Sequence, residues 1–189
     1  MLRPNRASGF AVLFIASCAS MPPGASRENA DQQFEALAAK FIDEYLEMNP
    51  ETATGLGDHR FDHRLNDRSL EGVNRERQLH DTYLQRLNAI PLSQLSTANQ
   101  VDYRILQNRL EYRLFAIDSL REHSWNPLLY NAGGAIHDLL SRDFAPLRDR
   151  LLSVRDRLDQ IPKQYLPQNR LFKVPRGSTL KRRSYRTKG

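Results

Sequence analysis

Apolar side chains recur at steps of three and four residues through most of this 189-residue chain. That spacing places them on one face of an α-helix, whereas a half-buried strand would require alternation. The pattern extends over residues 28–48, 69–89, 97–120 and 146–161. Because no segment has convincing strand alternation or an internal repeat, the sequence predicts an all-α fold, an irregular array of about five or six helices.

Capping and breaking residues predict where these helices begin and end. Asn49 as N-cap and Pro50 at the first helical position open a short helix that ends by Gly57. Ser69 can cap the segment that follows, and Thr97 to Gln100 match a capping box. The segment 57–67 between them is polar and is predicted to be a loop.

Two amphipathic segments have clearly predicted faces. The stripe expected to face inward on residues 97–120 is Val101, Ile105, Leu110, Leu114, Ile117 and Leu120. After a short helix over residues 135–141, the last helix begins at Pro146 and is expected to bury Leu147, Leu151, Val154, Leu158 and Ile161. Its opposite face is predicted to be solvated, with Arg148, Asp149, Arg155, Asp156, Arg157 and Asp159.

The first 17 residues have the layout of a secretory signal, with Arg3 and Arg6 before an apolar run at residues 10–15. Cys18 follows Ile-Ala-Ser, an arrangement that resembles the lipobox of bacterial lipoproteins. The resemblance implies that Cys18 is lipidated and becomes the mature N-terminus, with residues 18–30 as a flexible tether. The alternatives are a plain signal peptide with a chance cysteine, or a free thiol.

Lipidation would anchor the chain to a lipid bilayer through Cys18. The lipoprotein resemblance implies a cell-envelope location, and Ala19 rather than Asp after the cysteine indicates which membrane holds the chain. In a Gram-negative host this means the outer membrane, facing the periplasm.

The basic charge of the chain is concentrated at its C-terminal end. Residues 163–189 contain nine Lys and Arg and no acidic side chain, although the whole chain has 28 basic and 22 acidic residues. Without this segment and the two N-terminal arginines, 17 basic and 22 acidic residues remain. The acidic balance of the body does not support a nucleic-acid partner.

His59 and His63 have the i, i+4 spacing of two helical zinc ligands. However, Arg60 stands where a zinc peptidase has its Glu general base. The alternative is a loop in which the acidic residues pair with the basic ones, namely Asp58, Asp62 and Asp67 with Arg60, Arg64 and Arg68. The second interpretation is preferred, so no metal or catalytic residue is assigned.

Other candidate sites have weak signals. His123 and His137 are isolated histidines near aromatic or apolar residues, typical of structural positions. Gly133 and Gly134 precede a helix and could cradle a phosphate, but neither a P-loop lysine nor a strand accompanies them. No cofactor is predicted for this chain.

Three motifs in order resemble a bacterial family, domain of unknown function 885. They are FIDEYLEMNPETATGLGDHRFDHRL at 41–65, LSTANQVDYRIL at 95–106, and WNPLLYNAGG at 125–134 together with RDFAPL at 142–147. The resemblance covers about residues 34–165. It implies a secreted or lipid-anchored, mostly helical protein, similar to zinc metallopeptidases. The zinc-binding histidines of such proteins are expected in a C-terminal half that this sequence lacks.

Two functions are therefore expected. The chain is a truncated, non-catalytic N-terminal portion of such a protein, within residues 31–165. Alternatively, it is a stand-alone, non-catalytic envelope lipoprotein that binds a peptide or another envelope component. Residues 166–189 are expected to be disordered. They are interpreted as a frameshift product, or alternatively as a basic arm for anionic lipid or nucleic acid.

Overall fold

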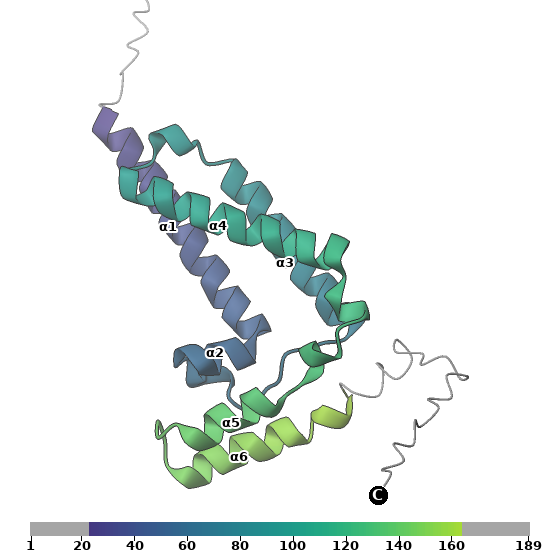
Figure 1. Cartoon of the computed structure of the whole chain (residues 1–189). Helices are drawn as coiled ribbons and strands as arrows, with labels where there is room; N and C mark the ends of the chain where they lie inside the picture. Colours follow the sequence, from purple (N-terminus) through teal and green to yellow (C-terminus); the bar gives the residue numbers. More distant parts are fainter. Residues whose placement is uncertain (1–22, 164–189) are drawn as a thin grey trace, which may run out of the picture.

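The computed structural model describes residues 23–163, with side chains from residue 28 (Figure 1). Within this range all regular structure is helical, which confirms the predicted all-α class. The longer helices are α1 (Pro23–Met48), α2 (Pro50–Leu56), α3 (Leu70–Asn88), α4 (Thr97–Phe115), α5 (Gly133–Ser141) and α6 (Leu147–Leu158). Short turns of helix connect them: η1 (His59–Phe61), η2 (Leu92–Gln94), η3 (Ala116–Leu120), η4 (Glu122–Ser124) and η5 (Pro127–Tyr130).

Helix α1 begins at Pro23, earlier than predicted. Residues 23–30, predicted to be part of a flexible tether, are therefore helical. The signal segment, Cys18 and residues 166–189 lie outside the described residues. None of the helices in residues 23–163 is long and apolar enough to cross a membrane.

A serine hydroxyl caps the N-terminus of both α3 and α4, although the cap of α4 lies one residue before the predicted capping box. Ser69 Oγ accepts a hydrogen bond from the Gly72 N–H at 3.0 Å, as predicted. For α4 the cap is Ser96 rather than Thr97, with its Oγ accepting from the Asn99 N–H at 3.3 Å. Both hydroxyls satisfy an N–H that has no partner within the first helical turn.

One region of the molecule is built from α1, α3 and α4, which pack together around an apolar core (Figure 1). Contacts from Asp31 to Ser96 and from Glu35 to Asn99 place α1 and α4 in parallel register. The core of this region consists of Ala30, Phe34, Phe41, Tyr83, Leu87, Ile90, Leu95, Tyr103 and Leu110. These side chains supply most of the hydrophobic stabilisation, since burial scales with apolar area.

A second region contains α2, α5 and α6, at the lower end of the molecule in Figure 1. Its apolar core is small, with Leu65, Ala132 and Ala135 buried and Ile161 partly buried against them. Leu139 of α5 and Val154 of α6 are also buried.

The predicted orientation of α6 was correct for Val154 and Ile161 but wrong for its leucines and for Arg157. Leu147, Leu151 and Leu158 are exposed, whereas Arg150 and Arg157 are buried. Arg157, assigned to a solvated face by its charge, is 0% exposed. The helical pattern was correct, but Arg150 and Arg157 turn inward, where the carbonyls of Arg142 and Ala135 accept their hydrogen bonds.

Candidate functional site

An apolar groove of about 450 Å³ lies between α1 and α4. Its lining includes Phe34, Ala38, Ala39, Ile42, Ile105 and Leu106. Ile42 is 54% exposed and Ile105 is 64% exposed, so large aliphatic side chains face solvent here. A groove of this kind between two helices suits the apolar face of a further helix.

The exposed side of α4 also corrects a prediction. Val101, Ile105 and Leu120 were expected to face inward, but all three are exposed. Leu110 and Ile117 are buried as predicted, but the first half of α4 buries Asn99 and Tyr103 in place of Val101 and Ile105. Of the three exposed side chains, Ile105 lines the groove.

His59 lies in the one-turn helix η1, and His63 lies in the turn that follows it. The His59 ring stacks on Phe144 at a centroid distance of 3.7 Å, and its Nδ1 lies 2.9 Å from Asp62 Oδ2. Residue 63 follows the one-turn helix η1, so the pair does not share a helical face. Among residues with described side chains, no group of three or more His, Cys, Asp or Glu could hold a metal ion.

A chain of hydrogen bonds continues from His59 into the interior of the second region. Asp62 Oδ1 accepts from the Thr54 hydroxyl at 2.6 Å, and Thr54 is fully buried. Arg157 Nη2 lies 2.6 Å from the same hydroxyl oxygen and donates to it. Thr54 therefore links a buried cation to a carboxylate, and the carboxylate in turn holds the histidine.

Arg157 is the central member of this network. Its Nη1 donates to the backbone carbonyl of Ala135 in α5 at 2.6 Å, so it joins α6 to both α5 and α2. Burial lowers the pKa of Arg157, while the nearby carboxylates of Asp62 and Glu51 act in the opposite direction. An arginine stays charged in proteins, so the network holds a buried positive charge.

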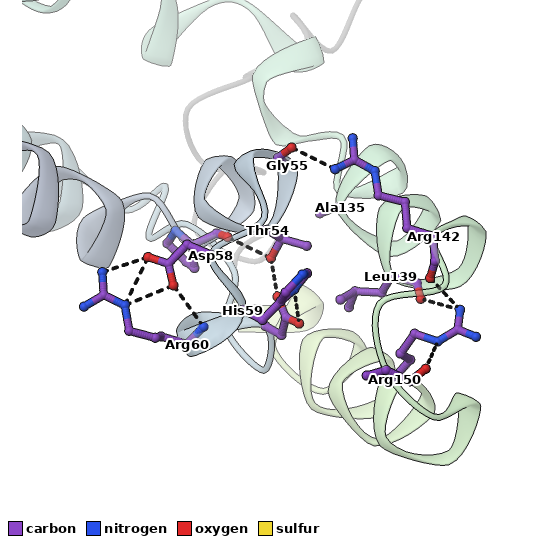
Figure 2. A network of polar contacts seen from close by, with 12 residues as sticks. Thr54, Gly55, Asp58, His59, Arg60, Ala135, Leu139, Arg142 and Arg150 are labelled. Atoms are coloured by element: carbon purple, nitrogen blue, oxygen red, sulfur yellow. Dashed lines mark hydrogen bonds and ion pairs between the residues drawn. The ribbon is translucent and has the colours of Figure 1, made fainter.

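Other arginines also bind backbone carbonyls in this region (Figure 2). Arg142 donates to the Gly55 carbonyl at 2.8 Å and connects α2 with the end of α5. Arg150 donates to the carbonyls of Ala145 and Arg142, each at 2.8 Å. These bonds satisfy carbonyls at a helix end and in the following turn, which would otherwise lack partners.

The predicted ion pairs of the loop are correct in one case. Arg60 Nη2 lies 2.7 Å from Asp58 Oδ2, as expected (Figure 2). The other pairings were wrong, because the partners come from neighbouring helices. Arg64 pairs with Glu47, Arg68 with Glu51, and Asp67 with Arg75.

The remaining candidate residues have structural contacts. The His123 carbonyl accepts a hydrogen bond from the Tyr130 hydroxyl at 2.5 Å, while the His137 side chain is exposed. Gly133 opens α5, and its N–H donates to Asn131 Oδ1 at 2.9 Å. That N–H is therefore occupied by the chain itself and is not presented to a phosphate.

Sequence reasoning missed the buried role of Arg157 and the groove on α1. No local signal separates a buried arginine from an exposed one in an amphipathic helix.

Comparisons with known proteins give a consistent assignment. The chain matches a family described as "Bacterial protein of unknown function (DUF885)" over residues 50–180. It is similar to a solved structure described as "a putative lipoprotein of unknown function from Shewanella oneidensis", with a TM-score of 0.66 and 28% sequence identity. The similarity covers 70% of this chain and 24% of that one, so the chain spans about a quarter of that protein.

No curated protein matches the chain. The family match runs past Tyr165 into the basic segment, further than the motifs in the sequence suggested. Because it includes more than half of the residues and agrees with the predicted motifs, the chain belongs to the DUF885 family.

Proposed function

We propose that this chain forms the N-terminal helical part of a longer envelope protein of the DUF885 family. In this proposal the groove between α1 and α4 is the surface on which the remainder of the fold packs. The observation that carries it is the exposed pair Ile42 and Ile105 in an apolar groove, on a chain that spans 24% of a similar solved structure. Large exposed apolar surfaces in soluble proteins commonly mark interaction sites.

The proposed role of these helices is structural. The family resemblance to zinc metallopeptidases leads us to assign the metal and the chemistry to the remainder of the fold. In the described part, His59 and Asp62 are engaged with Phe144 and Thr54 instead. A peptidase assay on the purified chain, with and without added zinc, should give no turnover above the buffer rate. Zinc-dependent turnover would refute a non-catalytic role.

The groove is tested by its affinity for an apolar dye. In a soluble version that begins at residue 18 with Cys18→Ser, the double variant Ile42→Ser/Ile105→Ser should bind less bis-ANS than the parent. The control is Leu56→Ser/Leu70→Ser, which removes two exposed aliphatic side chains outside the groove. Equal dye binding by the parent and the groove variant would count against an apolar docking surface.

We also propose that the chain is anchored to the outer membrane by lipidation of Cys18 and faces the periplasm. The lipobox-like residues before Cys18 and the lipoprotein description of the structural relative support this proposal. Cells grown with an alkyne-labelled palmitate should label the parent chain but not Cys18→Ser. Labelling that persists in the variant would exclude this cysteine as the acylation site.

The second candidate is a stand-alone lipoprotein that binds a partner in the same groove. The charged rim of the groove, with Glu35, Asp102 and Arg109, favours a partner that is not purely apolar. Cross-linking from Ile105→Cys in intact cells discriminates the two candidates. A cross-link to DUF885-type sequence supports the first, and a cross-link to an unrelated envelope protein supports the second.

A further inference from the structure

A second cavity, of about 280 Å³, lies where α1, α3 and α4 meet the loop after η1. Its lining differs from that of the apolar groove because it is rich in arginine and hydroxyl groups. The lining residues with ionisable or hydroxyl groups that matter here are Tyr45, Arg68, Glu76, His80, Arg109 and Tyr112. Arg113 completes the cationic side of the cavity.

Two of the three arginines are neutralised by carboxylates. Arg113 forms a two-point contact with Glu76, with Nε and Nη2 each donating at 2.7 Å. Arg68 Nη2 donates to Glu51 Oε2 at 3.1 Å. These pairs leave one positive charge of the cavity uncompensated, that of Arg109.

Arg109 is available to a ligand. Among the described residues its guanidinium makes a single hydrogen bond, a long one of 3.4 Å to the Tyr45 hydroxyl. The planar guanidinium offers several N–H donors in a fork that matches a carboxylate. The Tyr112 side chain is exposed and, like Tyr45, contributes an aromatic ring and a hydroxyl to the lining.

His80 lines the cavity and has one ring nitrogen without a hydrogen-bond partner among the described residues. The residue is 0% exposed, and its Nδ1 lies 2.8 Å from the Glu76 carbonyl, to which it donates. Its Nε2 has no hydrogen-bond partner among the described residues. Burial lowers the pKa of His80, so at neutral pH the ring adds no positive charge, and the cavity retains a net charge of one.

We propose that this cavity binds a small organic carboxylate, whose charged group is held by Arg109 between the Tyr45 and Tyr112 side chains. The single charge of a carboxylate monoanion balances the uncompensated positive charge of Arg109. A phosphate dianion would leave an excess negative charge in the cavity. The volume is near the lower end of ligand pockets, which limits the ligand to a small molecule. The proposal does not depend on which occupant covers the apolar groove, although Arg109 lines both the groove and this cavity.

The test uses the whole chain in a non-ionic detergent, titrated at constant ionic strength with benzoate and followed by isothermal calorimetry. Benzoate should bind, while the neutral analogue benzyl alcohol and inorganic phosphate should bind at least about tenfold more weakly. Arg109→Gln should weaken benzoate binding by about tenfold or more, because it removes the charged donors. The matched control is Arg104→Gln, which removes the same charge from an exposed position of α4 outside the cavity.

Several results would overturn the proposal. Absence of benzoate binding to the parent chain would remove its basis. Equal weakening by Arg109→Gln and Arg104→Gln would show that benzoate responds only to overall charge. Tighter binding of phosphate than of benzoate would replace the carboxylate assignment, and equal binding of benzyl alcohol would show that charge has no role.

Discussion

The two regions of this molecule are held together by different chemistry. The α1/α3/α4 region buries a continuous set of aromatic and aliphatic side chains, among them Phe41, Leu87 and Leu110. The α2/α5/α6 region has a much smaller apolar core and relies on the buried arginines Arg150 and Arg157. Hydrophobic burial has no fixed direction, whereas an arginine stabilises only the arrangement that places acceptors around its donors.

The difference has a consequence for stability. A buried charge is costly unless it is paired and hydrogen-bonded, so the second region depends on a few polar contacts. Loss of one such contact leaves unsatisfied groups behind. Loss of one core side chain in the first region leaves only a cavity, whose cost depends on how far its neighbours relax.

The largest effect is expected for Arg157→Ala. The change removes the donors that bind Ala135 O and Thr54 Oγ1, and it leaves Asp62 without the nearby cation. We expect a loss of about 4 kcal/mol, seen as an earlier transition of part of the helical signal in urea unfolding. Arg155→Ala is the control because this neighbour is exposed, and a change within about 0.5 kcal/mol is expected. Equal losses in both variants would contradict the special role of Arg157.

Leu87→Ala is expected to cost somewhat less, about 3 kcal/mol, because it opens a cavity in the first region. Leu87 is fully buried among the core side chains of α1, α3 and α4. Urea unfolding followed by far-UV circular dichroism measures the loss. The matched control is Leu70→Ala in the same helix, where the side chain is exposed. A loss below about 1 kcal/mol for Leu87→Ala would mean that this core is loosely packed.

A smaller effect depends on pH and comes from His80 in the first region. Its pKa is lowered by burial, so the unfolded chain takes up a proton near pH 6.5 while the folded chain does not. The contribution of His80 to the free energy of unfolding is therefore fully present above about pH 6.5. It decreases as the pH drops toward the lowered pKa, by up to about 1.4 kcal/mol per pH unit. His123, whose pKa is also lowered by burial, contributes in the same direction.

The pH effect is measured by urea unfolding between pH 7.5 and 5. His80→Gln should reduce the loss of stability on acidification. His137→Gln, at an exposed position, should leave it unchanged. An identical pH dependence in the parent and in His80→Gln would show that the buried ring does not control it.

The smallest effect is expected at the exposed ion pair between Arg77 and Asp118, where Nε lies 2.9 Å from Oδ1. This pair joins α3 to the turn after α4 within the first region. A double-mutant cycle with alanine at both positions should give a coupling of about 0.2–1 kcal/mol, since solvent screens exposed pairs. A coupling above about 2 kcal/mol would mean that polar contacts also dominate the first region.

Sequence reasoning placed the helices well because their ends are set by local chemistry. Ser69 and Pro50 act within one turn of their own positions, and Gly57 ends α2 with φ at 90°, where glycine is unstrained. The buried faces were harder to predict. The apolar stripes of α4 and α6 indicate a helix, but the neighbours decide which side is covered.

The candidate sites also depend on contacts between distant parts of the chain, which the local sequence does not predict. From the sequence, the histidine pair at positions 59 and 63 was judged only by the residue that follows His59, an arginine where a zinc peptidase has its glutamate. The stacking of His59 on Phe144 joins residues 85 positions apart and has no local signal. The groove combines side chains from α1 and α4, and the second cavity adds side chains from α3, so only the packing of the helices brings them together.

Native-state hydrogen exchange on the parent chain and on Arg157→Ala tests the difference between the two regions most directly. If buried arginines hold the second region, amides of α5 and α6 should lose protection in the variant while those of α3 and α4 keep theirs. Equal loss of protection in all four helices would contradict the account, because it would mean that the two regions unfold as one unit.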